Sequence, residues 1–370
     1  MKIFYDYQIF YSQEYGGISR YFCELASRLA TFDDMDVKIV AGVYINKYLM
    51  DCPLNLVAGY YIPSIAKTWT MRLFFNELFS SYWNMIKSPD IVHETYYLLE
   101  KKGSTPNKAA KKVITIYDMV YEKFGDLLPK SNLISLRKKQ AIREADHIIC
   151  ISENTKQDLL EYFDIEHKKV SVVYLGNSLD VKNSKQNDLF IFSKNSYILY
   201  VGQRSSYKNF DMLLKVYATY PNFKKDFRLV CFGGGSFSNE EQALINSFGL
   251  SEKQVIQVSG DDTILVNLYS NAAAFVYPSL YEGFGIPLLE AMACDCPVVC
   301  SNTSSMPEVA GSAAEYFDPY DQESIAHSLE NVLFSSEKAQ LLIKQGQERV
   351  KDFSWDKCAE ETRSIYLSLM

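Results

Sequence analysis

No stretch of this sequence approaches the ~18 consecutive apolar residues that a membrane-spanning helix needs, so we expect no transmembrane segment. The first residues run directly into strand-like sequence and lack the basic start and apolar stretch of a secretion signal. Neither a short-period repeat nor a low-complexity tract is visible. These absences argue against integral membrane and repeat proteins and predict a cytoplasmic protein.

The sequence also lacks the pattern of a zinc site, although it contains 8 cysteines. Cys294, Cys296 and Cys300 lie close together, but no second cluster of Cys and His completes a ligand set. The three lie where a helix pattern ends and an apolar strand pattern begins, and Cys in that setting acts as a small hydrophobic residue. Reduced thiols fit the cytoplasm.

A net charge of −7 and a pI of about 5.3 argue against nucleic acid as a partner, because no recognised nucleic-acid-binding module accompanies them. The first half of the chain nevertheless contains basic runs. We interpret them as solvated surface, and keep open that they anchor the protein to anionic lipid head groups at about 1 kcal/mol each. The residues are Lys101, Lys102, Lys108, Lys111, Lys112, Arg137, Lys138 and Lys139.

Apolar strand patterns alternate with amphipathic helix patterns in two series, which predicts two α/β domains with parallel, doubly wound sheets. Such sheets bind ligands beyond the carboxyl ends of their strands. A polar stretch at 177–194 separates the series and is interpreted as a linker. We predict domains at 1–180 and 181–350, a cleft between them, and a helix at 351–370 that crosses back to the first. The clearest strand candidates are Val37–Val43, Tyr197–Val201, Arg228–Phe232, Val255–Val258 and Ala274–Tyr277.

The segment Ile65–Ile86 is unusually aromatic and is flanked by Lys67 and Lys87. We expect most of its aromatic side chains in the core. The alternative is a partly exposed amphipathic helix that meets a bilayer or a lipid-linked ligand.

The segment Glu282-Gly-Phe-Gly-Ile-Pro-Leu-Leu-Glu290 is the strongest candidate for a binding site. Pro287 is typical of a first helical turn, so Glu290 would lie inside that helix and Glu282 on the loop before it. Free N–H groups at a helix start bind phosphate, and the two glycines let the backbone approach a ligand closely. The two carboxylates would then lie on either side of that ligand.

A second candidate follows the first strand of the second domain, in Gly202-Gln-Arg204-Ser-Ser-Tyr-Lys208-Asn209. Arg offers a planar fork and Lys a point charge, so both suit a diphosphate. Gly16-Gly17 has the corresponding place in the first domain, and Gly233-Gly234-Gly235 follows the strand at 228–232. Each glycine run alone is weak evidence.

In combination these motifs resemble family 4 of the glycosyltransferases, whose GT-B fold consists of two Rossmann-like, doubly wound domains facing a cleft. Within the family the chain is most similar to bacterial mannosyltransferase-like enzymes of O-antigen and capsule assembly. The similarity covers most of the chain and is stronger in the second half. The matching segments are Gly16–Arg20, Gly202–Asn209, Pro278–Ser279, Glu282–Cys294, Met306–Gly311 and Phe353–Trp355.

This resemblance implies roles on the donor side. Arg204 and Lys208 would bind the donor diphosphate and stabilise the charge that grows on it, and Gly17 would pack against it from the first domain. Glu282 would contact the donor sugar, and Glu290 the ribose hydroxyls. The remaining donor contacts are backbone ones, from Phe284 and Gly285 to the sugar, from Ile286 onward to the phosphates, and from Ser259 and Gly260 to the base.

One departure from the family concerns the strand at 113–116, after which the family commonly has His. Here Tyr117-Asp118 follows. Tyr can donate a hydrogen bond but is no base at neutral pH, so we expect Tyr117 to replace that contact. Asp118 is a candidate partner of the acceptor hydroxyl, or else a helix-capping or ion-paired carboxylate. We interpret His93, at the end of another strand, as structural.

The predicted activity is retaining transfer of a hexosyl group, with mannosyl from GDP-mannose as the first choice and a UDP-sugar as the alternative. The acceptor would be a saccharide or a lipid-linked saccharide in surface polysaccharide synthesis, reached by peripheral contact at the inner face of the membrane. No metal or other cofactor is expected, since the Asp-x-Asp at 34–36 lies in a surface turn. A sugar-nucleotide-binding subunit with weakened catalysis is the alternative of another class, and a sugar-nucleotide epimerase ranks low.

Overall fold

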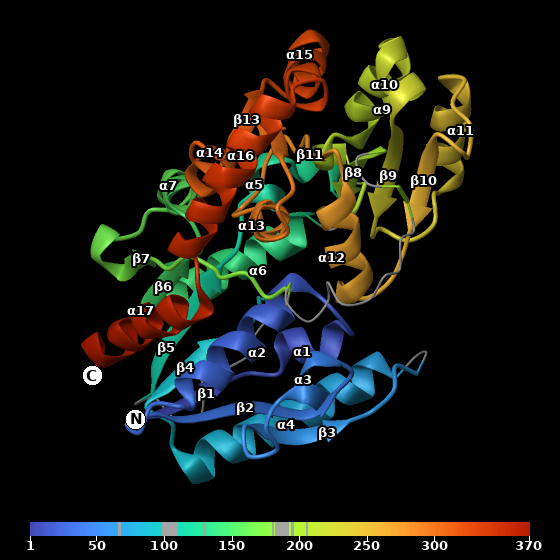
Figure 1. The fold of residues 1–370 in the computed structure, drawn as a ribbon. Helices are drawn as coiled ribbons and strands as arrows, with labels where there is room; N and C mark the ends of the chain where they lie inside the picture. The colour runs from blue at the N-terminus through green and yellow to red at the C-terminus, as the bar shows by residue number, and fades with distance from the viewer. Residues whose placement is uncertain are drawn as a thin grey trace. The chain divides into compact units, whose positions relative to one another are not determined.

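The computed structural model (Figure 1) describes residues 1–65, 68–97, 110–128, 131–179, 181, 192–193, 196–204 and 206–370. The chain forms two compact units. Unit 1 comprises Met1–Leu175 together with Trp355–Met370, and unit 2 comprises Gly176–Ser354. The sequence placed these boundaries at 180 and 350. The later second boundary has a packing reason, because the Phe353 ring lies 5.8 Å from that of Phe284 within unit 2.

Unit 1 is built on a seven-stranded sheet in the order β3-β2-β1-β4-β5-β6-β7, with all strands parallel. The strands are β1 (Lys2–Tyr5), β2 (Asp36–Tyr44), β3 (Val57–Tyr61), β4 (Ile91–Glu94), β5 (Lys111–Ile116), β6 (His147–Cys150) and β7 (Val170–Val172). The helices are α1 (Gln8–Ser12), α2 (Gly17–Leu29), α3 (Tyr48–Asp51), α4 (Trp69–Lys87), α5 (Val120–Lys123), α6 (Ser131–Glu144), α7 (Glu153–Tyr162) and α17 (Trp355–Ser368).

Unit 2 repeats this arrangement with a six-stranded parallel sheet in the order β10-β9-β8-β11-β12-β13. The strands are β8 (Tyr197–Val201), β9 (Arg228–Phe232), β10 (Val255–Val258), β11 (Ala274–Tyr277), β12 (Val298–Ser301) and β13 (Ala314–Phe317). The helices are α9 (Phe210–Thr219), α10 (Pro221–Asp226), α11 (Asn239–Ser247), α12 (Asp262–Asn271), α13 (Ile286–Ala293), α14 (Met306–Ala310), α15 (Gln322–Leu333) and α16 (Ser336–Arg349).

Both sheets confirm the predicted Rossmann-like, doubly wound class. The chain winds outward in one direction through the first three strands and then in the other, so the order reverses between β1 and β4 in unit 1 and between β8 and β11 in unit 2. Loops at such a reversal diverge beyond the carboxyl ends of the strands and leave room for a ligand. Ligand-binding residues are therefore expected in the loops after β8 and β11, and after β1 and β4.

Helix α17, at the red end of the chain in Figure 1, packs beside the blue α2 and completes the core of unit 1. Its Tyr366 side chain is fully buried and contacts residues of β1 and β4. The Tyr366 hydroxyl lies 2.5 Å from Nδ1 of His93 and 3.1 Å from the Tyr5 hydroxyl. The other ring nitrogen of His93 lies 2.9 Å from the Thr115 hydroxyl. His93 is thus structural, as the sequence suggested.

This buried histidine should make unit 1 sensitive to acid. Burial, with a smaller contribution from His147, lowers the pKa of His93 from 6.5 to about 3. Between these two values the unfolded chain binds a proton that the folded chain does not, so stability is fully present above pH 6.5 and is lost as pH falls. The expected loss is about 1.4 kcal/mol per pH unit.

The measurement is the unfolding free energy from urea titrations at pH 7 and pH 5, for the wild type and for His93→Gln. The variant should lose less stability than the wild type between the two pH values, by about 2 kcal/mol. A His147→Gln variant serves as the control for the neighbouring histidine. Equal pH dependence in the wild type and in His93→Gln would contradict the assignment.

Helix α4 corrects the expectation for the aromatic segment. Most of its aromatic side chains are exposed rather than in the core, and the helix buries Arg72, Asn76 and Asn84 instead. Asn76 bonds both backbone groups of Val43 on β2, and Phe75 and Phe79 close against Gly42, where a Cβ would lie 2.7 Å from the Phe79 ring. One face of α4 therefore covers the sheet through polar and close-packed contacts, which leaves the apolar residues on the other face.

The basic runs also need a correction. Lys138 does not belong to a solvated surface, because its side chain is fully buried and its Nζ lies 2.6 Å from Oε2 of Glu122. The same ammonium group donates to the backbone oxygen of Asp118. Lys112 pairs with Glu144, whereas Lys139 is exposed. Lys101, Lys102 and Lys108, and most of the predicted linker, lie outside the described residues.

Candidate active site

Two of the predicted site residues meet across the strand reversal of unit 2. Lys208 ends a short 3-10 helix, Ser206–Lys208, in the loop after β8, and Glu282 lies in the loop after β11. The Lys208 ammonium lies 2.6 Å and 2.9 Å from the two oxygens of the Glu282 carboxylate. Their side chains retain 16% and 11% exposure, so the pair is largely but not fully removed from water.

The rings of Tyr207 and Tyr277 lie beside this pair. The Lys208 ammonium is 5.2 Å from the first ring centre and 5.6 Å from the second, within the range of a cation–π contact. Burial raises the pKa of the Tyr277 hydroxyl well above its usual value, and the negative charge of Glu282 adds to the increase. Tyr277 therefore stays protonated and can act as a donor to this carboxylate.

Two serines after β12 fix the backbone of the Glu282 loop. The N–H of Glu282 donates to the Ser304 hydroxyl at 2.9 Å. The buried Ser305 hydroxyl lies 2.9 Å from the backbone oxygens of both Glu282 and Phe284. Ser304 has a φ of +52°, which costs strain in a residue other than glycine. We did not predict either serine, and the signal for them was only their place after the neighbouring strand.

The second carboxylate of the motif lies in helix α13, as predicted. The helix starts at Ile286, with Pro287 in its first turn and Gly285 as its cap at a φ of +102°. Glu290 is buried, and its Oε2 accepts a hydrogen bond of 3.1 Å from the Tyr269 hydroxyl. The N-terminus of α13 thus begins directly after the Glu282 loop, and its backbone N–H groups are suited to an anion.

Phe284 has a packing role besides any role of its backbone. Its ring is buried against Phe353, which keeps the Gly283–Gly285 turn on the body of unit 2.

The three cysteines that follow helix α13 are buried, as expected of small hydrophobic residues. Burial raises the pKa of the Cys296 and Cys300 thiols, so they stay protonated.

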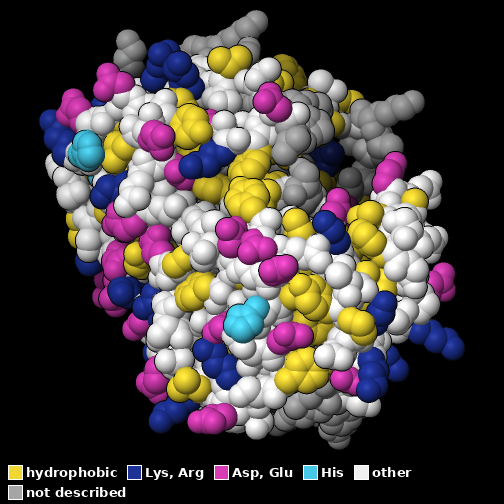
Figure 2. Space-filling model, turned by 90° about the horizontal axis from the view of Figure 1, so that it is seen from above, with side chains coloured by type: hydrophobic (Ala, Val, Ile, Leu, Met, Phe, Trp, Pro, Cys, Tyr) yellow, Lys and Arg dark blue, Asp and Glu magenta, His cyan; other side chains and the backbone are white. Residues whose placement is uncertain are grey.

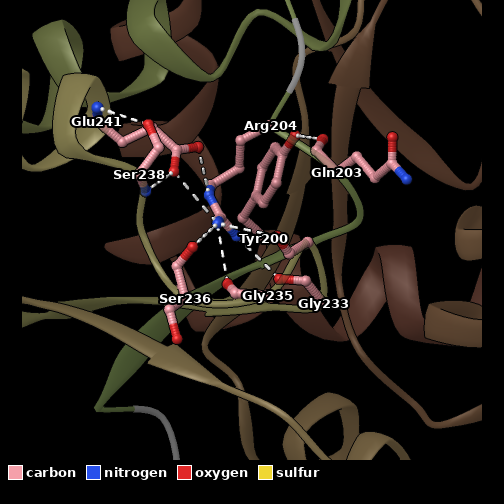
Figure 3. A network of polar contacts seen from close by, with 9 residues as sticks. Tyr200, Gln203, Arg204, Gly233, Gly235, Ser236, Ser238 and Glu241 are labelled. Carbon is pink, nitrogen blue, oxygen red and sulfur yellow. Dashed lines mark hydrogen bonds and ion pairs between the residues drawn. The ribbon is translucent and has the colours of Figure 1, made fainter. Parts of the chain in front are cut away.

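Arg204 does not join the Lys208–Glu282 pair in this structure. Its Nε donates to Glu241 of α11 at 2.7 Å, and the rest of the guanidinium donates to backbone oxygens of residues 233–236, at 2.8 Å for Gly233 and 2.9 Å for Gly235. Figure 3 shows Arg204 at the centre of these bonds. Its side chain is only 2% exposed. Arg204 therefore fixes the glycine loop after β9, and any contact with a diphosphate would add to that role.

The glycine run explains why this arrangement forms. Gly233, Gly234 and Gly235 all have positive φ angles, so their carbonyls turn toward one point. A Cβ on Gly234 would lie 2.7 Å from Nη1 of Arg204. The same guanidinium lies 4.9 Å from the centre of the Phe237 ring. Arg204 also lines a surface pocket of about 560 Å³ between the loop and α11.

Neutralising Glu241 should destabilise unit 2. In Glu241→Gln the buried Arg204 loses the one carboxylate that pairs with it among the described residues, and the expected loss of unfolding free energy is about 3 kcal/mol. Arg204→Lys should cost a similar amount, since one ammonium cannot reach all the oxygens that a guanidinium bonds. Urea unfolding is the measurement, and Glu240→Gln, a neighbouring exposed glutamate, is the control. Stability equal to that of the control would show that the buried pair contributes nothing.

Ser259 and Gly260 lie exposed in the loop after β10, at the edge of the sheet. The Ser259 hydroxyl accepts a hydrogen bond from Gln257, and Gly260 precedes Asp261, which caps α12. Within the described part of the chain, no hydrogen bond or ion pair joins either residue to Lys208 or Glu282. Their assignment to base binding stays a prediction.

Gly17 is the first residue of α2 in unit 1. Apart from its chain neighbours and its own helix backbone, no heavy atom of the described residues lies within 4 Å of where a Cβ of Gly17 would be. Internal packing therefore does not require glycine here, in contrast to Gly16, whose Cβ would lie 2.2 Å from Oε1 of Gln13. Open space at a helix N-terminus agrees with the predicted approach of a phosphate.

The two residues predicted after β5 have structural partners. Tyr117 is buried, and its hydroxyl donates to the backbone oxygen of Thr95 at 3.1 Å. Burial raises the pKa of Tyr117 well above its usual value. Oδ1 of Asp118 accepts the N–H of Val120, the first residue of α5, although the residue that caps this helix is Met119. This geometry gives no support to a catalytic role for Tyr117, and the role of Asp118 toward the acceptor hydroxyl stays a prediction.

The fold is that of a two-domain α/β protein with Rossmann-like sheets, and comparisons with known proteins identify the class. The Glycosyltransferase Family 4 model matches residues 15–181, and the model of Glycosyl transferases group 1 matches residues 181–349. The chain is thus a glycosyltransferase with the two Rossmann-like domains of the GT-B fold. Together the two models span residues 15–349, and the chain is similar to bacterial mannosyltransferases.

Three similar proteins illustrate the relationship. O-antigen chain mannosyltransferase B of Escherichia coli is 29% identical over 272 residues, which are 70% of this chain and 71% of that protein. An N-acetylgalactosaminyltransferase of Campylobacter jejuni, named for a diphospho-undecaprenol substrate, is 34% identical over 48% of either chain. The structure of a sucrose-phosphate synthase from Thermosynechococcus elongatus superposes with a TM-score of 0.77 at 20% identity, covering 100% of this chain and 98% of that one.

Proposed function

We propose that this glycosyltransferase transfers a mannosyl group from GDP-mannose, with retention of configuration, to a saccharide or lipid-linked saccharide in bacterial surface polysaccharide synthesis. The Lys208–Glu282 pair carries the proposal, because it places a cation and a carboxylate at the strand reversal where such sheets bind nucleotides. The mannosyl group is inferred from the E. coli relative, which is an O-antigen chain mannosyltransferase.

The reaction follows from the charges at this pair. The bond between the anomeric carbon and the diphosphate oxygen breaks while the acceptor oxygen bonds to the same face of the sugar. The acceptor proton passes to the departing phosphate oxygen. Lys208 would stabilise the negative charge that grows on the diphosphate, and Glu282 would bind the sugar or stabilise positive charge on its ring. Arg204 and Glu290 remain proposed ligands of the diphosphate and the ribose, and no metal is invoked.

A screen of sugar nucleotides by thermal unfolding tests the donor. A ligand that binds the folded state raises its stability by RT ln(1 + [L]/Kd), so GDP-mannose should raise the unfolding temperature more than UDP-sugars at equal concentration. Release of mannose from GDP-mannose without an acceptor would then show that the site is catalytically active. A larger effect of a UDP-sugar would overturn the choice of donor, and binding without hydrolysis or transfer would favour the binding subunit.

The exposed face of α4 supports the further proposal of peripheral membrane contact. More than half of the exposed large apolar side chains of the described residues lie between Met50 and Ile86. Those on α4 are spaced three or four residues apart, which places them on one face. On the face shown in Figure 2, by contrast, apolar side chains lie among acidic and basic ones. The α4 residues are Met71, Phe74, Phe75, Leu78, Tyr82, Met85 and Ile86.

The proposed occupant of this face is a lipid bilayer. The Campylobacter relative is named for a substrate linked to diphospho-undecaprenol, and a chain of that kind resides in a membrane. None of the described helices combines the length and the apolar character that crossing a bilayer requires. Contact would therefore be peripheral, with Trp69 and Tyr82 suited to the head-group region.

Flotation with phosphatidylglycerol-containing vesicles tests the contact. Phe74→Ser/Leu78→Ser should reduce the bound fraction at least tenfold, whereas Phe334→Ser/Leu341→Ser, a matched pair of exposed apolar residues in unit 2, should not. Equal binding of both double variants, or no binding of the wild type, would rule out α4 as the membrane contact.

A further inference from the structure

Among the described residues, six side chains of unit 1 have a buried polar atom without a hydrogen-bond partner. Three of them are large donors: Tyr11 with its hydroxyl, Arg72 with Nε and Nη1, and Arg137 with Nε. Tyr11 is fully buried and Arg72 is 7% exposed. Leaving such groups unsatisfied costs about 1–3 kcal/mol each, and more for charged ones, so native proteins rarely keep them without a reason.

These groups come from three different elements of unit 1. Tyr11 lies in α1, directly after β1, and Arg72 lies in the first turns of α4. Arg137 lies in α6, the helix that leads into β6. In a parallel sheet the segments that follow a strand, and the N-terminal turns of the returning helices, lie at the carboxyl edge, where ligands bind.

A ring contact places Tyr11 beside the start of α4, and the charges of both arginines act on the Tyr11 hydroxyl. The ring of Trp69, one turn before Arg72, lies 5.9 Å from the Tyr11 ring. Burial raises the pKa of the Tyr11 hydroxyl to about 12, while the charges of Arg137 and Arg72 lower it and those of Glu77 and Asp6 raise it. Both arginines therefore lie near this hydroxyl.

The carboxylates nearby do not satisfy the arginines. Asp6 accepts hydrogen bonds from Thr95 and from the backbone and side chain of Gln8. Glu77 is exposed, and no hydrogen bond or ion pair between it and either arginine is recorded in the described part of the chain. A buried cation without an ion-pair partner is unfavourable for folding, so stability alone does not account for Arg72.

We propose that Arg72, Arg137 and the Tyr11 hydroxyl form a binding site for the phosphate or diphosphate group of the acceptor. Arginine matches phosphate oxygens with its planar set of N–H donors, and the phenol adds a neutral donor. The proposal rests on the proposed transfer to a lipid-linked acceptor. Helix α4 would then contact the lipid with its outer face and bind the phosphate with the inner one.

Binding of two soluble probes, inorganic diphosphate and a three-isoprene prenyl diphosphate, tests the site by isothermal titration. In Arg72→Gln and in Arg137→Gln the Kd should increase tenfold or more, equivalent to the loss of one charge-assisted hydrogen bond. The control is Arg143→Gln, an exposed arginine on the same helix as Arg137, which should bind like the wild type. The unfolding temperature of Arg72→Gln should be no lower than that of the wild type, because a buried unpaired charge has been removed.

The outcomes distinguish a lipid-linked diphosphate from the free diphosphate group as the ligand, and a binding role of the arginines from a structural one. Arginine-dependent binding of the prenyl diphosphate alone supports a lipid-linked ligand, and arginine-dependent binding of both probes supports recognition of the diphosphate itself. Unchanged Kd values in Arg72→Gln, or absence of binding to the wild type, overturn the site. A lower unfolding temperature with unchanged Kd shows a purely structural arginine and also overturns it. Release of mannose from the donor without acceptor does not use this site, so the proposed function is judged separately.

Discussion

Replacing Lys208 with Met is expected to lower the rate of sugar transfer at least a hundredfold. Lys208 is the cation that the structure places beside Glu282 at the strand reversal of unit 2. Removing one group that stabilises developing negative charge in a water-poor site costs about 2.7–4 kcal/mol of transition-state stabilisation, or a factor of 10²–10³. Transfer from GDP-mannose, followed by release of GDP, is the measurement.

A matched set of variants separates chemistry from folding. Lys208→Met leaves the Glu282 carboxylate largely buried without this partner, so some stability should be lost. Lys208→Met/Glu282→Gln removes both charges and should recover that stability but not the activity. Lys344→Met, at an exposed position of α16, should change neither. If activity returned with stability in the double variant, the pair would be structural and the proposed mechanism would be wrong.

The strands of unit 2 could be predicted almost to the residue. Tyr197–Val201, Arg228–Phe232, Val255–Val258 and Ala274–Tyr277 agree with β8, β9, β10 and β11. Helices cover both faces of such a sheet, so its strands are continuous apolar runs bounded by polar loops. The loops of the site could be predicted for the same reason, because glycines and charged residues follow these strands directly.

Partners across the fold could not be predicted in this way. Glu241, 37 positions after Arg204 in the chain, is its ion-pair partner only because α11 packs beside the loop after β9. The aromatic pattern of α4 was misleading for a similar reason. The many aromatic residues suggested a core helix. The surface of β2 that α4 covers includes Gly42, which contacts Phe79, and the backbone of Val43, which bonds Asn76. Glu241 is far from Arg204 in the sequence, and Asn76 is far from Val43, so no local pattern predicts either contact.

Helix α17 leads to the prediction with the largest effect on folding. A chain ending at Ser354 should fail to form a stable unit 1, because α17 buries Trp355 and Tyr366 against residues that the first 115 positions supply. The Trp355 ring lies 6.0 Å from that of Tyr21, and the Tyr366 hydroxyl bonds His93 and Tyr5. Without the helix, the His93 ring and the Tyr5 hydroxyl lose this hydrogen-bond partner.

Graded variants make this expectation quantitative. Tyr366→Ala should reduce the unfolding free energy by about 3–5 kcal/mol, as for other large aromatic side chains in cores, and Tyr366→Phe by about 1–3 kcal/mol, the cost of an unmet hydrogen bond at His93. Leu367→Ala, at the adjacent exposed position, should stay within about 0.5 kcal/mol. Similar losses for Tyr366→Ala and Leu367→Ala in urea unfolding would contradict the placement of α17. A loss confined to Tyr366 would show that the last residues of the chain belong to the core of the first unit, and that this unit is completed only after unit 2 has been synthesised.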